Sequence, residues 1–302
     1  MTEHSQSAPS TSVPSTPAGS GIGWRFLYSA RWIGYFAMLV VFSIACVLLG
    51  NWQFDRRAEA RAEIARIDAN YDAAPAPVAE ELRSLDAFDE DRQKWRPVEI
   101  VGEYVGEPML ARNRPGPSGV GSDLVQALRT TSGEVFFVDR GWVPVDGASA
   151  ESLAAGDLPA PPTGEVRVEA RLRASEPPIP GRTSEGRTVA SIDLAEVARA
   201  TGTDGEAYVG AYGMLISETP EGEHGDLPAR PERDEGPHLS YALQWYVFIL
   251  IAGIGVAYAA RREYRGLNSG SAEVLEQDRR TSERRKRRGP SDAEEEDALI
   301  DA

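Results

Sequence analysis

The feature that most constrains this chain is an uncharged run near its C-terminal end, Leu239–Ala260, which reads LSYALQWYVFILIAGIGVAYAA. Arg261 and Arg262 follow it directly. A helix that crosses the hydrocarbon core of a bilayer needs about 20 mostly apolar residues. The run therefore predicts a transmembrane helix over 239–260, and the rest of the chain has to be compatible with a membrane anchor.

A second apolar run, Trp32–Gly50, lies near the N-terminus and follows Arg25 and Arg31. A cleaved signal peptide is the alternative interpretation of such a run. The run is long for a signal peptide, and NWQFDRR follows it in place of a small-residue cleavage site. We therefore expect an uncleaved transmembrane helix over 32–50.

Two spans place both termini on the same side of the membrane. Arginines stand at the corresponding ends of both runs, namely Arg25, Arg31, Arg261, Arg262 and Arg265. Because positive residues favour the cytoplasmic side, we expect cytoplasmic termini and an extracytoplasmic domain over 51–237.

The segments outside the spans differ in composition. Residues 1–24 are rich in Ser, Thr, Pro and Gly, which predicts disorder. Residues 261–302 predict a charged cytoplasmic tail, whose basic block TSERRKRRGP has contact with anionic membrane lipid as an alternative role. The stretch from Asn51 to His238 holds 35 acidic and 20 basic residues. That negative balance argues against nucleic acid as a partner.

The central domain has the pattern of a β-rich fold. Alternating or apolar strand-like stretches occupy 96–105, 109–112, 123–130, 134–145, 164–172 and 207–218. A helix is expected to continue from the first span to Pro75, and another over 191–202, which ends at Gly202. We predict an α+β membrane protein in which two transmembrane helices flank an extracytoplasmic, mostly antiparallel β domain. That domain is a sheet or a partly closed barrel with one or two helices.

Reactive side chains are scarce. Cys46 is the only cysteine and lies in an apolar run, so an intramolecular disulfide, a CxxC pair and a thiolate metal cluster are excluded. The histidines are His4, His224 and His238, and no HExxH, GxSxG or P-loop pattern is present. We expect a protein that is not an enzyme, and a membrane-anchored enzyme with dispersed active-site residues is the competing class.

His238 stands at the start of the second span. On a helix, His238, Tyr241 and Trp245 share one face. One interpretation is a polar residue at the membrane interface that bonds to Tyr241 or a lipid headgroup. The other is an axial ligand to haem iron, because neutral imidazole binds iron and aromatic rings line porphyrins. The first span contains no histidine, so a second axial ligand has to come from elsewhere.

A second candidate surface surrounds the motif VDRGWVP, which contains Arg140 and Trp142. A structural corner is one interpretation, since the glycine permits an unusual backbone. Recognition of a partner or of a propionate by Arg140 is the other. Asn113 and Arg114, which precede a Pro/Gly-rich turn, are candidates for the same surface.

Four stretches, taken together and in this order, resemble the Surfeit-locus-one family of cytochrome c oxidase assembly factors. They are LGNWQFDRRAEAR at 49–61, VGEYVGEPMLARNRPGPSGVGSDLVQAL at 101–128, VFFVDRGWVPV at 135–145 and HLSYALQWYVF at 238–248. VDRGWVP combined with HxxYxxQW is the most specific part. The resemblance departs at Arg61, where the family often has Lys, and at Pro237, where a polar residue is common.

The resemblance implies a chaperone of the respiratory chain in a bacterial plasma membrane. The expected partners of such a chaperone are the cytochrome c oxidase core subunit, other assembly factors and membrane lipid. The chaperone is also expected to bind haem a transiently. The family's proposed iron ligand matches His238, and its neighbouring aromatic position matches Trp245. The competing hypothesis is a membrane-anchored scaffold that holds an oxidase subunit and never binds haem.

Overall fold

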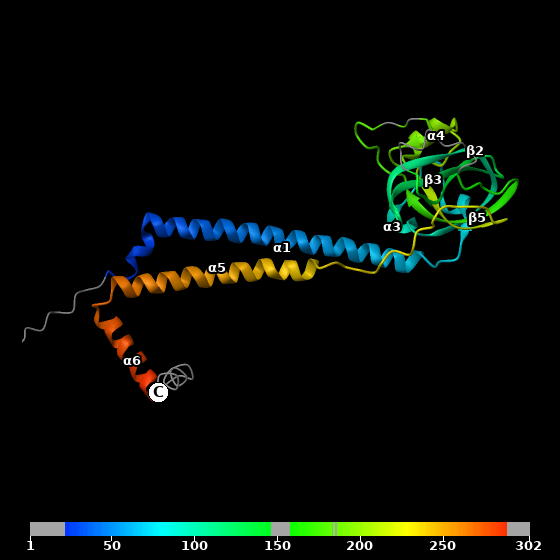
Figure 1. Cartoon of the computed structure of the whole chain (residues 1–302). Coiled ribbons are helices and arrows are strands. Elements are labelled where there is room, and N and C mark those ends of the chain that lie inside the picture. The colour runs from blue at the N-terminus through cyan, green and yellow to red at the C-terminus, as the bar shows by residue number, and fades with distance from the viewer. Residues whose placement is uncertain (1–21, 146–157, 183, 185, 289–302) are drawn as a thin grey trace, which may run out of the picture. The chain divides into compact units, whose positions relative to one another are not determined.

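The computed structural model describes residues 22–145, 158–182, 184 and 186–288 (Figure 1). The chain divides into two compact units. The helical unit contains the described residues up to Arg56 and those from Pro237 onward, and the β unit is Arg57–Gly236. Most of the segment expected to be disordered, 1–24, lies outside the described residues, as does the end of the tail, 289–302.

The helical unit is built from η1 (Gly23–Tyr28), the N-terminal part of α1 (Ala30–Asn70), α5 (His238–Leu267) and α6 (Ala272–Arg288). Both α1 and α5 are long and apolar enough to cross a membrane, by length and composition. In their most apolar windows only 11% and 6% of the residues are buried, so most apolar side chains face outward. The helix expected to continue to Pro75 is confirmed to Asn70.

Polar contacts join α1 and α5 at both ends, so the helices run antiparallel, side by side (Figure 1). At one end Arg31 forms an ion pair with Glu263, and the indole Nε1 of Trp32 donates to Glu263 Oε2 at 3.0 Å. At the other end Tyr246 Oη donates to Asn51 Oδ1 at 3.0 Å. These contacts fix which residues of the two helices lie opposite each other.

The β unit contains seven strands and three short helices among its described residues, in addition to the end of α1. The strands are β1 (Ala76–Pro77), β2 (Pro97–Gly116), β3 (Gly119–Thr130), β4 (Val135–Val143), β5 (Glu165–Ala174), β6 (Thr188–Val189) and β7 (Ala211–Thr219). The helices are α2 (Val78–Glu81), α3 (Glu90–Gln93) and α4 (Leu194–Thr201). The predicted helix over 191–202 is confirmed: the Asp193 side chain caps α4, and Gly202 ends it in a left-handed conformation.

The strands form a mixed sheet that closes on itself. Its order is β1-β2-β3-β4-β7-β5, and β5 pairs with β2 as well. β2 pairs with β5 over residues 97–103 and with β3 over residues 102–116, and its register against β3 shifts between Val105 and Met109. The stretches expected as two strands, 96–105 and 109–112, are therefore one bent strand. Pairing between the long strands is antiparallel except for β4 with β7, which is parallel.

β4 lies between β3 and β7 in the sheet and is buried along its whole length. Phe136 and Val138 contribute to one hydrophobic cluster, whereas Val135 and Phe137 contribute to another. Because successive side chains of a strand point to opposite faces, β4 separates the two clusters. The next two residues along this strand, Asp139 and Arg140, carry opposite charges.

Candidate functional site

His238 is the first residue of α5 and contacts α1. Its ring Nδ1 lies 2.8 Å from the side-chain oxygen Oε1 of Gln53, and the pair is partly buried. With Oε1 as the acceptor, Nδ1 carries the proton, so the lone pair of the neutral ring resides on Nε2. The contact thus holds the imidazole in one orientation, as an outer hydrogen bond does for metal-binding histidines.

Aromatic side chains continue from His238 along α5. Tyr241 is 48% exposed, and the rings of Trp245 and Phe248 meet edge to face with centroids 5.7 Å apart. The structure thus places exposed aromatic surface within two helical turns of the imidazole. Whether these side chains bind a cofactor stays a prediction.

Gln53 is a site residue that the sequence reasoning did not single out. The signal was present in LGNWQ, because a glycine at the end of the first span lets another helix approach. A Cβ added at Gly50 would meet Tyr246 Cε2 at 3.0 Å. This close packing of α1 against α5 supports the nearby contact between Gln53 and His238.

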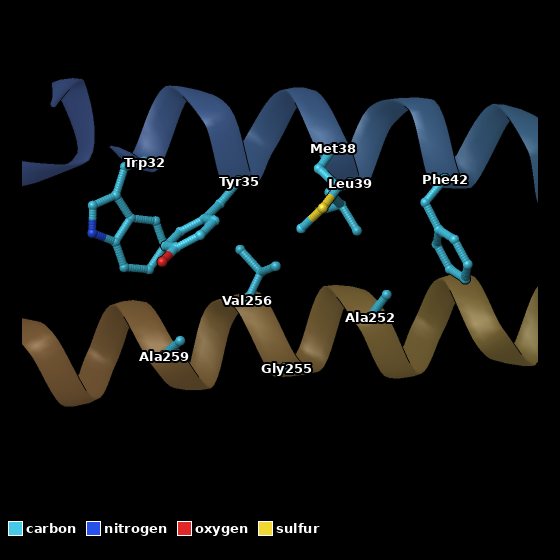
Figure 2. A pocket seen from close by; sticks show the side chains of 9 residues that line it. All are labelled: Trp32, Tyr35, Met38, Leu39, Phe42, Ala252, Gly255, Val256 and Ala259. Carbon is cyan, nitrogen blue, oxygen red and sulfur yellow. The ribbon is translucent and has the colours of Figure 1, made fainter. Parts of the chain in front are cut away.

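An apolar groove of about 450 Å³ lies between α1 and α5 (Figure 2). Large side chains of α1 project toward a face of α5 that carries smaller ones; the lining residues are Trp32, Tyr35, Met38, Leu39, Phe42, Ala252, Gly255, Val256 and Ala259. On α5 the groove begins about 20 Å from His238, at a rise of 1.5 Å per residue. The groove has no charged lining residue, and it is a packing feature of the two apolar helices.

Arg140 is fully enclosed in the β unit. Its Nη2 donates to Glu218 Oε1 at 2.7 Å and to the carbonyl oxygen of Glu223 at 2.7 Å, and Nη1 donates to the carbonyl oxygen of Pro159 at 3.3 Å. The guanidinium lies 5.0 Å from the ring centre of Tyr104. These contacts match the structural-corner interpretation, because a partner or a propionate could reach Arg140 only by displacing Glu218.

Trp142 also has an internal role. Its Nε1 donates to the carbonyl oxygen of Arg114 at 3.0 Å, and a Cβ at Gly116 would lie 2.2 Å from its ring. The indole therefore packs flat on the β2–β3 hairpin. Asn113 is exposed on that hairpin with a φ of 62°. The structure brings Arg114 and Trp142 together and leaves Asn113 at the surface.

A polar pocket of about 450 Å³ lies on the Asp139 side of β4. Arg114 pairs there with Glu176 at 2.5 Å and with Asp123 at 3.2 Å. Burial, together with the charge of Asp123, raises the pKa of Asp139 to about 7. Burial raises the pKa of Asp123 to about 6. The sequence reasoning named Arg114 and missed the carboxylates, which come from separate strands and loops.

Two further observations limit the chemistry. Among the described residues, no group of three or more His, Cys, Asp or Glu side chains is arranged to hold a metal ion. His224, in the β unit, contacts the carbonyl oxygen of Gly225 through Nδ1 at 2.7 Å. Of the two described histidines, His238 is the one on the helix that carries Tyr241, Trp245 and Phe248.

Comparison with known proteins agrees with the resemblance in the sequence. The model of the SURF1 family matches residues 40–250. An uncharacterized SURF1-like protein of Mycobacterium tuberculosis is 32% identical over 247 residues, which are 80% of this chain and 87% of the relative. Surfeit locus protein 1 of Rattus norvegicus is 26% identical over 66% of each chain. The matched region contains Gln53, the closed β-sheet and His238, and this chain belongs to the SURF1 family.

Proposed function

We propose that this protein is an assembly factor for haem–copper cytochrome c oxidase that holds haem a transiently at His238 and aids its insertion into the oxidase core subunit. The observation that carries the proposal is the contact of His238 Nδ1 with Gln53 Oε1. It leaves Nε2, the atom with the lone pair, available to an external ligand.

The residues around His238 fit a haem. If haem a binds here, it would supply an iron that takes the imidazole of His238 as a ligand. Gln53 orients the ring, while the exposed Tyr241 and the half-buried Trp245 would offer flat apolar surface to the porphyrin. Transfer of haem to another protein requires binding that is readily reversed. Binding through one histidine among the described residues suits this requirement, because only one ligand has to be released.

The membrane arrangement forms part of the proposal. We place α1 and α5 across the plasma membrane of a bacterium, with both termini in the cytoplasm and the β unit outside. The outward-facing apolar side chains and the position of the arginines support this orientation. His238 then lies at the outer surface of the membrane, where lipid surrounds the spans and where the core subunit and other assembly factors can be reached.

The role requires no bond chemistry of the protein itself, so we propose no enzymatic activity. The alternative function is a membrane-anchored scaffold that holds an oxidase subunit without haem. The acidic composition of the β unit supports this scaffold function, because an acidic surface attracts a basic partner.

The test is a difference spectrum of the purified full-length protein after co-expression with haem a synthesis. We expect bound haem a in the wild type and its loss in His238→Ala, with His224→Ala as a matched control that keeps it. Gln53→Leu should weaken haem retention by about 10–100-fold, as outer-shell changes do at metal sites. If His238→Ala retained haem, His238 would not be the iron ligand. Absence of haem from the wild type, despite haem a in the host membranes, would favour the scaffold.

The topology has a separate test. Cys46 is the only native cysteine, so a Cys46→Ser background allows single cysteines to be placed at will. In intact cells an impermeant maleimide should label Ser118→Cys, in the β unit, and should not label Ser282→Cys, in α6. Labelling of Ser282→Cys alone would reverse the proposed orientation.

A further inference from the structure

The polar pocket beside β4 has a composition that the proposed function does not use. Its lining includes Arg114, Asp123, Asp139, Glu176 and Tyr212, which come from four strands and one connecting segment. Pockets of this size commonly hold ligands. The identities and pairings of its charges indicate what kind of ligand fits.

Negative groups are in excess in the pocket. Four carboxylates line it, those of Asp123, Asp139, Glu176 and Asp226, against the two guanidinium groups of Arg114 and Arg173. Arg114 is already paired with two of the carboxylates, and Arg173 lies 4.4 Å from the ring centre of Trp95. An anion such as a haem propionate would meet repulsion and would find both arginines engaged.

Asp139 is the most deeply buried carboxylate of the pocket, and it forms no ion pair with the described residues. Its residue is only 7% exposed, and its one hydrogen bond among the described residues is from Gly141 N to Oδ1, at 3.0 Å. A buried carboxylate without a cation is costly, so burial favours its protonated form. The raised pKa values of Asp139 and Asp123 agree with this view. The charged groups that face Asp139 are Asp123, Glu176 and Arg114, and the hydroxyl of Tyr212 faces it as well.

We propose that this pocket binds the guanidinium group of an arginine side chain from a partner protein, which pairs with Asp139 and displaces its proton. Guanidinium is planar, binds carboxylates through two hydrogen bonds and stacks on aromatic rings. The pocket offers these surfaces through Asp139 and through the rings of Trp142 and Tyr212. The acidic balance of the β unit attracts a basic partner to the same unit.

The proposal predicts binding that depends on pH in a defined direction. Only the ionised form of Asp139 pairs with the cation, so affinity rises as the pH rises through the pKa of Asp139. With a pKa of about 7, the ionised fraction increases about 30-fold between about pH 5.5 and about pH 8, and the apparent affinity follows that fraction. Binding near pH 6.5 should release most of one proton.

The experiment uses acetyl-arginine methylamide as the probe and acetyl-citrulline methylamide as its uncharged counterpart. Calorimetric titrations of the full-length protein in detergent give the affinity, and repeats in buffers of different ionisation enthalpy give the proton release. We expect the arginine probe to bind more tightly at high pH and the citrulline probe not to bind. Asp139→Asn should lose at least tenfold in affinity at about pH 8, a change of about 1.4 kcal/mol, together with the pH dependence.

Glu103→Gln is the matched control, because it removes one negative charge from an exposed position on β2, and we expect wild-type binding. Hydrogen exchange of the β4 amides verifies that each variant is folded. The proposal is overturned if wild-type binding is weaker than about 1 mM at high pH. It is also overturned if wild-type binding releases no proton, or if both probes bind equally well.

Discussion

Asp139 and Arg140 are neighbours on β4, and both are buried, yet their surroundings differ. Arg140 is 0% exposed and meets a carboxylate, two carbonyl oxygens and an aromatic ring. Only its Nε lacks a hydrogen bond within the described part of the chain. Asp139, on the opposite face of the strand, borders a pocket and accepts a single hydrogen bond from the described residues, that of Gly141.

The difference separates a structural charge from one that awaits a ligand. Burial alone does not distinguish them, because both side chains are more than nine-tenths buried. What distinguishes the two residues is whether the protein itself supplies a side chain of opposite charge to pair with them. Arg140 has Glu218 within the fold, and Asp139 has no cation of its own within bonding distance among the described residues.

The largest effect is expected from Arg140→Ala. The substitution leaves Glu218 buried and unpaired, so it should lower the free energy of unfolding of the β unit by about 3–5 kcal/mol. Urea titrations of the full-length protein, followed by hydrogen exchange of the β4 amides, measure this loss. The double variant Arg140→Met, Glu218→Leu should recover most of it, because no charge stays unpaired. A loss below about 1 kcal/mol in the single variant would contradict a structural role for the pair.

Gly141→Ala tests the corner between the two environments. Gly141 has a φ of 100°, and an added Cβ would lie 2.8 Å from the backbone carbonyl carbon of Gly225. We expect a loss of about 2–3 kcal/mol, from backbone strain together with the clash. Gly181→Ala is the control, since its φ of 76° gives the strain without a neighbour within 4 Å. Equal losses in both variants would show that the contact with Gly225 is unimportant.

Asp139→Asn should change how stability depends on pH. Because the folded state raises the pKa of Asp139 from about 3.9 to about 7, it binds more protons than the unfolded state between these values. The contribution of Asp139 to stability therefore falls as the pH rises from about 4 to about 7 and is constant above. The variant lacks this decline and should be about 2 kcal/mol more stable than the wild type near pH 8. If the free energies of unfolding of the wild type and of Asp139→Asn changed with pH in the same way over this range, Asp139 would not be an unpaired buried carboxyl.

The sequence predicted the individual helices and strands better than the pairing of strands that closes the sheet. Local signals suffice for α4, where Asp193 and Gly202 mark both ends, and for the long apolar part of α1. The joining of the two stretches at 96–105 and 109–112 into one bent strand depends on pairing with β3 and β5. The parallel pairing of β4 with β7 also depends on contacts between segments far apart in the chain. Such long-range pairing cannot be predicted from a short stretch of sequence.

The candidate sites show the same limit. The histidine and the aromatic face of α5 follow from helical periodicity, but the partner of His238 depends on how α1 and α5 pack. In VDRGWVP the alternation of a strand implies that Asp139 and Arg140 point to opposite faces. It does not reveal that Glu218, far along the chain, meets Arg140, whereas Asp123 repels Asp139.

The smallest effect we expect comes from removing one hydroxyl on each side of β4. Tyr104 Oη donates to Glu218 Oε2 at 2.7 Å on the Arg140 side, so Tyr104→Phe should cost about 1–2 kcal/mol. Tyr212 lines the Asp139 pocket, and its hydroxyl makes no hydrogen bond to the described residues, so Tyr212→Phe should change stability by less than about 0.5 kcal/mol. Urea unfolding at about pH 7 measures both changes, because neither phenol is ionised there. If Tyr212→Phe cost as much as Tyr104→Phe, the pocket would hold a closed network like that of Arg140, and the distinction between the two faces of β4 would be lost.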